Sequence, residues 1–211
     1  MDSLFGAIIV IVVILFSTVL HELAHGFTAY KLGDRTAKED GRLTLNPLKH
    51  LDPFMSVILP LFLYFLGGPV FGGAKPVPVN TRNLKGGVWG MALVAFAGPA
   101  TNFLIALSAF LVGHFSGGLY DSGLWGFVVS EFVLINLGFM VFNLLPIPPL
   151  DGSRILYALM PDGVRELMDR GEKYGIVIVY ALIVIGGGIF SSIMIGAING
   201  ILGGFYWIIG L

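Results

Sequence analysis

The sequence predicts an all-α polytopic membrane protein, with a three-helix core, a re-entrant loop, short β-like segments and additional C-terminal helices. Of its 211 residues, 56% are hydrophobic and only 12% are charged, about half the charged share of soluble domains. The mean hydropathy is +0.89. Several uncharged runs also reach the roughly 20 residues that a membrane span needs. We therefore expect a single integral-membrane domain over 1–211, with its core in about 4–160 and a C-terminal hydrophobic segment at 174–211.

Five apolar runs follow one another along the chain. They cover residues 4–20, 54–74, 86–120, 122–150 and 174–211. The first run has no basic residue before it and no small-residue cleavage site after it, so we expect a retained membrane helix rather than a signal peptide. The last run is long enough for two short passes, or for one pass and an interfacial helix. The number of spans is therefore expected to lie between four and six.

The basic residues predict the orientation in the membrane. All twelve lie in 27–53, 75–85 and 154–173, whereas the loop at 114–123 has none. By the positive-inside rule the three basic loops are cytoplasmic, in a multi-pass protein of the cell (plasma) membrane. If the first two share a side, the run at 54–74 must dip into the membrane and return, and its glycines and proline permit this. The alternative is that 54–74 crosses the membrane as an ordinary helix, which leaves the three basic residues of 75–85 on the external side.

Side chains that carry chemistry gather at the end of the first apolar run. His21-Glu-Leu-Ala-His25 has the pattern H-E-x-x-H. On a helix, positions i and i+4 share a face, so both imidazoles can bind one zinc ion while Glu22 serves as a general base. The structural alternative is a pair of histidines capping a helix at the membrane interface. Ionisable groups in an apolar helix are costly in lipid, which favours the functional interpretation.

A catalytic zinc needs a third protein ligand. The chain has no cysteine, and His50 and His114 lie in a polar loop and on the opposite side, which leaves two carboxylates. At 1.5 Å per residue, Glu22 lies roughly 27 Å along its helix and Asp151 reaches a similar depth, whereas Glu131 is on the order of 15–20 Å away. Prolines before Asp151 and a glycine after it permit a tight turn. Depth therefore favours Asp151.

Three motifs in order resemble the signatures of the site-2 protease family of intramembrane zinc metalloproteases. They are His21-Glu-Leu-Ala-His25, Ala97-Gly-Pro-Ala-Thr-Asn102 and Asn143-Leu-Leu-Pro-Ile-Pro-Pro-Leu-Asp-Gly152. The resemblance spans about 15–160, and the connecting elements at 41–47, 50–53 and 75–80 resemble a compact prokaryotic branch without PDZ or CBS domains. It implies one zinc per chain held by His21, His25 and Asp151, with Glu22 as the general base.

The same resemblance implies a substrate and a place of action. Relatives cleave in or near a transmembrane helix of a membrane protein, close to the cytoplasmic side, in regulated intramembrane proteolysis. The implied partners are the lipid bilayer and a transmembrane substrate that another protease has trimmed. No basic tract is present that would bind nucleic acid.

Polar residues near the motifs have open interpretations. Asn102 and Asn143 lie in apolar helices, where they either form interhelical hydrogen bonds or hold the substrate backbone or the oxyanion near zinc. His50 and Asp52 either orient a zinc histidine or cap a helix and form a turn. We assign no role to Glu131.

The sequence also suggests how a substrate would bind, and it leaves other functions to be weighed. A helical peptide bond hides its carbonyl, so an exposed strand edge near the site would capture the unwound substrate, and 42–46 and 77–80 are the candidate runs. The main alternative function is a membrane metal transporter or channel that uses the same His/Asp cluster. A membrane-anchored zincin for soluble substrates would need a polar catalytic domain, and an inactive relative would lack one of the four key side chains.

Overall fold

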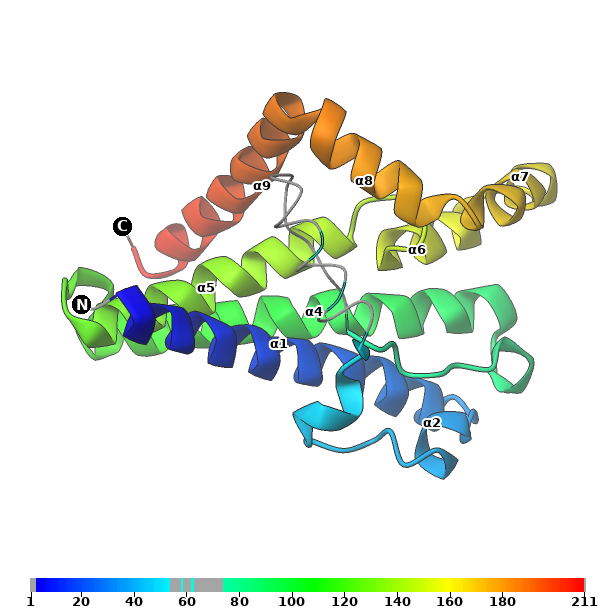
Figure 1. Ribbon diagram of the computed structural model, residues 1–211, viewed down its shortest axis with the longest axis horizontal. Coiled ribbons are helices and arrows are strands. Elements are labelled where there is room, and N and C mark those ends of the chain that lie inside the picture. Colours follow the sequence, from blue (N-terminus) through cyan, green and yellow to red (C-terminus); the bar gives the residue numbers. More distant parts are fainter. Residues whose placement is uncertain (1–2, 54–57, 59–61, 63–73, 211) are drawn as a thin grey trace.

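The computed structural model describes residues 3–53, 58, 62 and 74–210 (Figure 1). Within these ranges the regular structure is helical and no strand occurs. Four helices are long and apolar enough to cross a membrane, judged by length and composition. They are α1 (Ser3–Lys31), α4 (Gly87–Phe115), α5 (Leu124–Asn143) and α9 (Gly187–Ile208). The prediction of an all-α polytopic membrane protein is confirmed, and the part of the chain that the structure describes holds four candidate spans.

Shorter elements connect these four helices. They are α2 (Thr36–Glu39), η1 (Pro47–His50), η3 (Thr81–Asn83), η4 (Gly118–Tyr120), α6 (Asp151–Leu159), α7 (Asp162–Glu172) and α8 (Gly175–Ile185). Local sequence explains several boundaries. The Asn46 side chain accepts a hydrogen bond from the backbone of Leu48 at 3.0 Å, and Pro47 occupies the first position of η1, which suits its fixed φ and missing N–H.

The long helices place the two chain ends on one side of the molecule and the charged segments on the other. In Figure 1 the N-terminus, the turn at η4 and the C-terminus all lie toward the same end. The short helices α2, α6 and α7 lie toward the opposite end. The basic residues that follow α1 and those of α6 and α7 are therefore gathered at one end, as the positive-inside argument requires.

Helix α4 lies between α1 and α5 and forms the centre of the core (Figure 1). Its Phe110 is 1% exposed and belongs to a buried cluster with Val129 and Leu137 of α5 and Phe205 of α9. The rings of Phe110 and Phe205 lie 5.3 Å apart. The C-terminal helix α9 is thus attached to the other spans through an aromatic contact.

The C-terminal apolar run forms two helices that meet at Gly186. Helix α8 has 11 residues, a length of about 16 Å, which is too short for the roughly 30 Å hydrocarbon core. Helix α9 has 22 residues and is long enough to span it. Of the two arrangements expected for 174–211, the structure has one candidate span and one shorter apolar helix.

The expected re-entrant loop at 54–74 falls almost entirely outside the described residues. The two strand-like runs beside it can be compared with the structure. Residues 42–46 contain a bend and no strand, and 77–80 is extended without pairing to another strand. The two segments are linked instead through the buried Arg42, whose Nη2 donates to the carbonyl of Lys75 at 2.7 Å.

Most backbone N–H groups of 75–80 are already bound or missing. Lys75 donates to the His50 carbonyl, Val77 to Glu22 and Asn80 to Asp34, while the prolines at 76 and 78 have no N–H. The expectation of a free strand edge at 77–80 is therefore not met in this conformation, because side chains from α1 and the following turn occupy its donors.

Candidate metal centre

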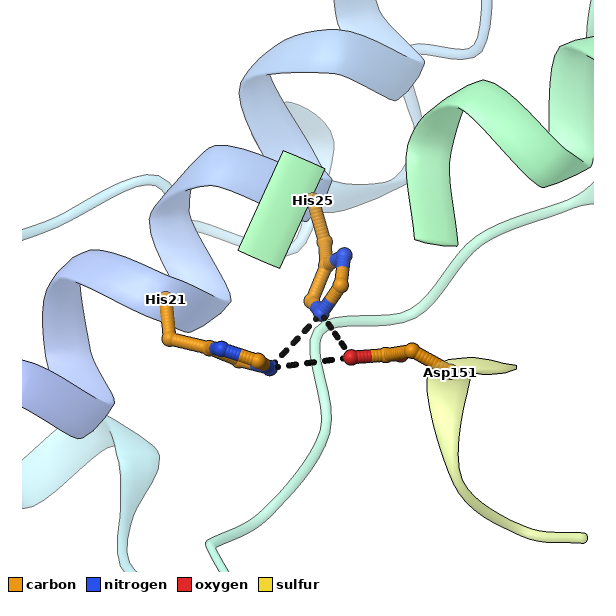
Figure 2. A group of neighbouring side chains, drawn as sticks. All are labelled: His21, His25 and Asp151. Carbon is orange, nitrogen blue, oxygen red and sulfur yellow. Dashed lines mark hydrogen bonds and ion pairs between the residues drawn. The ribbon is translucent and has the colours of Figure 1, made fainter. Parts of the chain in front are cut away.

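The histidines of the H-E-x-x-H motif and Asp151 converge on one point (Figure 2). His21 and His25 lie one turn apart on α1, with their Nε2 atoms 3.0 Å from each other. Oδ2 of Asp151, the first residue of α6, lies 3.2 Å from Nε2 of His21 and 3.4 Å from Nε2 of His25. Both histidines are buried, at 7% and 9% exposure. Asp151, the carboxylate expected at this depth in the membrane, thus lies together with both histidines.

This triangle has the dimensions of three zinc ligands. A tetrahedral zinc with bonds of 2.0–2.2 Å separates its ligand atoms by about 3.3–3.6 Å. The three observed separations of 3.0, 3.2 and 3.4 Å are close to that range. Within the described part of the chain, Oδ2 of Asp151 is also buried and has no hydrogen-bond partner. Buried lone pairs that face one another are unfavourable unless a cation lies between them, so the donor set fits a bound zinc.

The Nδ1 atom of each imidazole, which points away from the metal position, lies at hydrogen-bond distance from an oxygen atom of α4. Nδ1 of His25 lies 2.7 Å from the carbonyl oxygen of Val94, and Nδ1 of His21 lies 2.6 Å from Oδ1 of Asn102. The Val94 carbonyl can only accept, so Nδ1 of His25 carries the proton and Nε2 presents a lone pair to the metal position. Such contacts orient metal-binding histidines and fix their tautomers.

Helix α4 carries these supports at a spacing of four residues. Val94, Gly98 and Asn102 lie on one face of α4, opposite His25 and His21 of the antiparallel α1. Between the two supports, Gly98 brings its backbone against both rings. A Cβ atom at position 98 would lie 2.5 Å from Nε2 of His25 and 2.6 Å from Nε2 of His21. The glycine of the Ala97–Asn102 motif therefore provides the space in which the imidazoles lie.

A second glycine allows Asp151 to reach the site. A Cβ atom on Gly152 would lie 2.2 Å from the carbonyl oxygen of Leu144 and 2.5 Å from that of Leu145. Gly152 is not among the glycines with positive φ, so it is needed for close packing of α6 on the end of α5 rather than for the left-handed turn conformation that glycine often supplies. The structure thus gives a packing reason for the glycine that follows Asp151.

Glu22 lies beside the extended segment at 74–80. Its Oε2 accepts a hydrogen bond from the backbone N–H of Val77 at 2.8 Å. Since a carboxylate has two oxygens and several lone pairs, this bond leaves Oε1 able to accept a proton. Gly26, one turn further along α1, has Val77 and Leu43 against it, so the same segment packs along this part of α1.

The buried carboxylate of Asp34 anchors that segment. It accepts hydrogen bonds from the backbone N–H of Asn80 at 2.7 Å, from the Asn83 amide at 3.3 Å, and from the backbone and hydroxyl of Thr36 at 3.1 and 2.5 Å. Burial raises the pKa of Asp34, but the hydrogen bonds from Thr36, Asn80 and Asn83 outweigh it and hold this pKa below its ordinary value.

The remaining candidates from the sequence lie outside the metal-binding group. Asn102 is fully buried between His21 and Asn136, so it supports a histidine and does not face a substrate. Asn143, the last residue of α5, donates to the Phe139 carbonyl of its own helix at 3.0 Å. Nε2 of the buried His50 lies 2.8 Å from the Thr44 carbonyl, which agrees with the turn-forming alternative.

Comparison with known proteins identifies relatives along most of the chain. Residues 114–186 match the model of "Peptidase family M50". YwhC of Bacillus subtilis, assigned by its name to the zinc metalloproteases, is 42% identical over 181 residues, which cover 82% of this chain and 79% of that protein. Rip2 of Mycolicibacterium smegmatis, similarly named, is 34% identical over 182 residues, covering 84% of this chain and 67% of that protein.

A more distant relative is an archaeal zinc metalloprotease. The protein from Methanocaldococcus jannaschii is 28% identical over 160 residues, and the matched region covers 75% of this chain but 36% of the archaeal protein. No solved structure matches the fold. The chain belongs to peptidase family M50, the site-2 protease family of zinc metalloproteases.

Proposed function

We propose that this protein is an intramembrane endopeptidase that holds one zinc ion per chain through His21, His25 and Asp151 and uses Glu22 as its general base. The observation that carries the proposal is the convergence of three buried ligand atoms within a membrane-spanning helix and the start of α6. When bound, zinc would activate a water molecule and polarise the scissile carbonyl. Glu22, beside His21 on α1, would take up the proton of the attacking water and pass it to the leaving amine.

The position of the site points to a substrate within the membrane. His21 and His25 belong to the candidate span Leu4–Lys31, at the end where the basic segments gather. Ligands at that depth favour cleavage in or near a transmembrane helix, on the cytoplasmic side of the cell membrane. The substrate would be a transmembrane protein, and trimming by another protease would precede this cut. Residues 1–211 would act as one domain in this reaction.

The transporter alternative receives no support from the described residues. Metal flux needs a polar path across the membrane. An open groove of about 450 Å³ along α1, α4 and α5 has a mainly apolar lining, in which Thr101 and Ser108 carry the hydroxyl groups. Ser17, Asn102 and Asn136 are fully buried and bonded to neighbouring side chains, so they do not line a passage.

The test is the substitution Glu22→Gln in the full chain. Gln cannot accept a proton at neutral pH, so cleavage of a reconstituted transmembrane substrate should fall by at least about 10²-fold, the size of a general-base contribution. Zinc content, measured by mass spectrometry, should stay near one ion per chain because Glu22 is not a ligand.

Glu131→Gln provides a matched control in another spanning helix, and it should leave both cleavage and zinc content unchanged. The proposal would be wrong if Glu22→Gln retained wild-type cleavage, or if vesicles containing that variant and the wild type carried zinc across the membrane equally.

A further inference from the structure

A row of buried polar side chains lies behind His21. Ser17, Asn102 and Asn136 are each 0% exposed, although they come from three apolar spanning helices. Nδ2 of Asn102 donates to Oδ1 of Asn136 at 2.9 Å, and Nδ2 of Asn136 donates to Oγ of Ser17 at 2.9 Å. Buried amides in lipid are costly unless their hydrogen bonds are satisfied. Neither Ser17 nor Asn136 belongs to the three sequence motifs.

The row has a direction that is set by one backbone carbonyl. Nδ2 of Asn136 also donates to the carbonyl of Phe132 at 2.8 Å. That carbonyl can only accept, so the amide NH₂ of Asn136 must face it and Oδ1 must face Asn102. Asn102 then presents its own NH₂ to Asn136 and its Oδ1 to His21. Nδ1 of His21 must therefore carry the proton, and Nε2 is left with a lone pair on the metal side.

We propose that Asn136 is a positioning residue for the metal centre, which acts through Asn102 to fix the tautomer of His21. This inference rests on the proposed function, in which His21 is a zinc ligand. His25 needs no such relay, because the Val94 carbonyl accepts directly from its Nδ1 at 2.7 Å. The two histidines thus have the same tautomer, and in both cases a backbone carbonyl fixes it. The carbonyl acts directly on His25, whereas it acts on His21 through the side-chain amides of Asn136 and Asn102.

The substitution Asn136→Leu removes the relay while keeping an apolar side chain of similar size. Asn102 can then rotate its amide and present NH₂ to Nδ1 of His21, which favours the tautomer with the proton on Nε2. That tautomer cannot bind zinc through Nε2. Loss of an outer partner of a metal ligand typically weakens metal binding by about 10–100-fold, and we expect a loss of that size.

Two further variants distinguish a relay from general packing. Ser17→Ala removes a hydrogen bond from the same Asn136 amide but leaves the Phe132 carbonyl in place, so zinc affinity should stay within about threefold of the wild type. In the double variant Asn136→Leu/Asn102→Asp, a carboxylate at 102 can only accept from Nδ1 of His21. Zinc affinity should therefore recover, which a purely structural role of Asn136 would not predict.

The measurements are the zinc dissociation constant of the full chain in detergent, by chelator competition, and the ring ¹⁵N chemical shifts of histidine in the zinc-free protein. Wild type should show His21 protonated at Nδ1, and Asn136→Leu should shift it toward Nε2. Where leucine prevents folding, Asn136→Ala gives the same comparison. The inference is overturned if Asn136→Leu keeps wild-type affinity and shifts, or if Ser17→Ala weakens zinc as much. A wild type without zinc would instead refute the proposed function.

Discussion

The substitution Gly98→Ala tests whether the zinc histidines lie against the backbone of α4. The added Cβ would lie 2.5 Å from both Cε1 of His21 and Nε2 of His25. An ordinary contact for such atoms is about 3.5–4.0 Å, so the rings or the helices must move apart by roughly 1 Å. Zinc sites tolerate ligand displacements of only about 0.2 Å. We therefore expect zinc affinity to fall by about 100-fold, which corresponds to about 2.7 kcal/mol.

The assay compares Gly98→Ala with Gly138→Ala, the same change in α5. A Cβ atom at position 138 would meet nothing within 4 Å, so this control should bind zinc as the wild type does. Chelator competition gives the affinity, and circular dichroism checks that both variants are folded. If folded Gly98→Ala bound zinc within about threefold of the wild type, the imidazoles would not be packed against Gly98, and the account of the motif would be refuted.

Two other predictions concern the Asp34 anchor and the membrane orientation. The pKa of Asp34 is lowered in the folded state, so its contribution to stability is present above the ordinary carboxyl range and is lost as the pH falls through the lowered pKa. Asp34→Asn should destabilise the protein by about 1–3 kcal/mol at neutral pH, and the stability difference from the wild type should narrow in acid. Thermal unfolding in detergent measures this difference, and a difference that did not depend on pH would contradict the anchoring role of the Asp34 carboxylate. The chain has no cysteine, so Ser122→Cys should react with a membrane-impermeant maleimide in intact cells and Glu39→Cys only after permeabilisation, whereas the reverse pattern would invert the proposed orientation.

The grouping of His21, His25 and Asp151 could be predicted from the sequence because it depends on local rules. The i, i+4 spacing of His21 and His25 follows from helix geometry, and Asp151 was selected by counting residues along two segments that cross the membrane in the same direction. The apolar runs likewise predicted the spanning helices. None of these inferences needed knowledge of which residues of one helix face another.

The supports of the site could not be predicted, because they depend on the register between helices. Nothing in the sequence near Ser17 or Asn136 distinguishes them from other small polar residues of apolar helices. Their role appears only when α1 and α5 are placed against α4. The free strand edge expected at 77–80 is not present for a related reason. Glu22 of α1 and Asp34 of the turn after α1, both far away in sequence, occupy the N–H groups of Val77 and Asn80.

The metal centre is built from two facing rows with the same period. Ser17, His21 and His25 lie at intervals of four on α1, and Val94, Gly98 and Asn102 do so on α4. Because the helices are antiparallel, His25 meets Val94, both rings lie against Gly98, and His21 meets Asn102. A shift of α4 by one residue would rotate its row by about 100° and remove all three contacts together.

It follows that the register of α1 on α4 determines the geometry of the proposed zinc site. Rigid helices position catalytic groups more accurately than loops do, and here the third ligand is also attached to a helix, through the close packing that Gly152 permits. Under the proposed function the substrate must adapt to the site, because the two histidines move only with α1 and Asp151 moves only with α6. We therefore expect unwinding of the proposed substrate helix, rather than rearrangement of the proposed ligands, to precede cleavage.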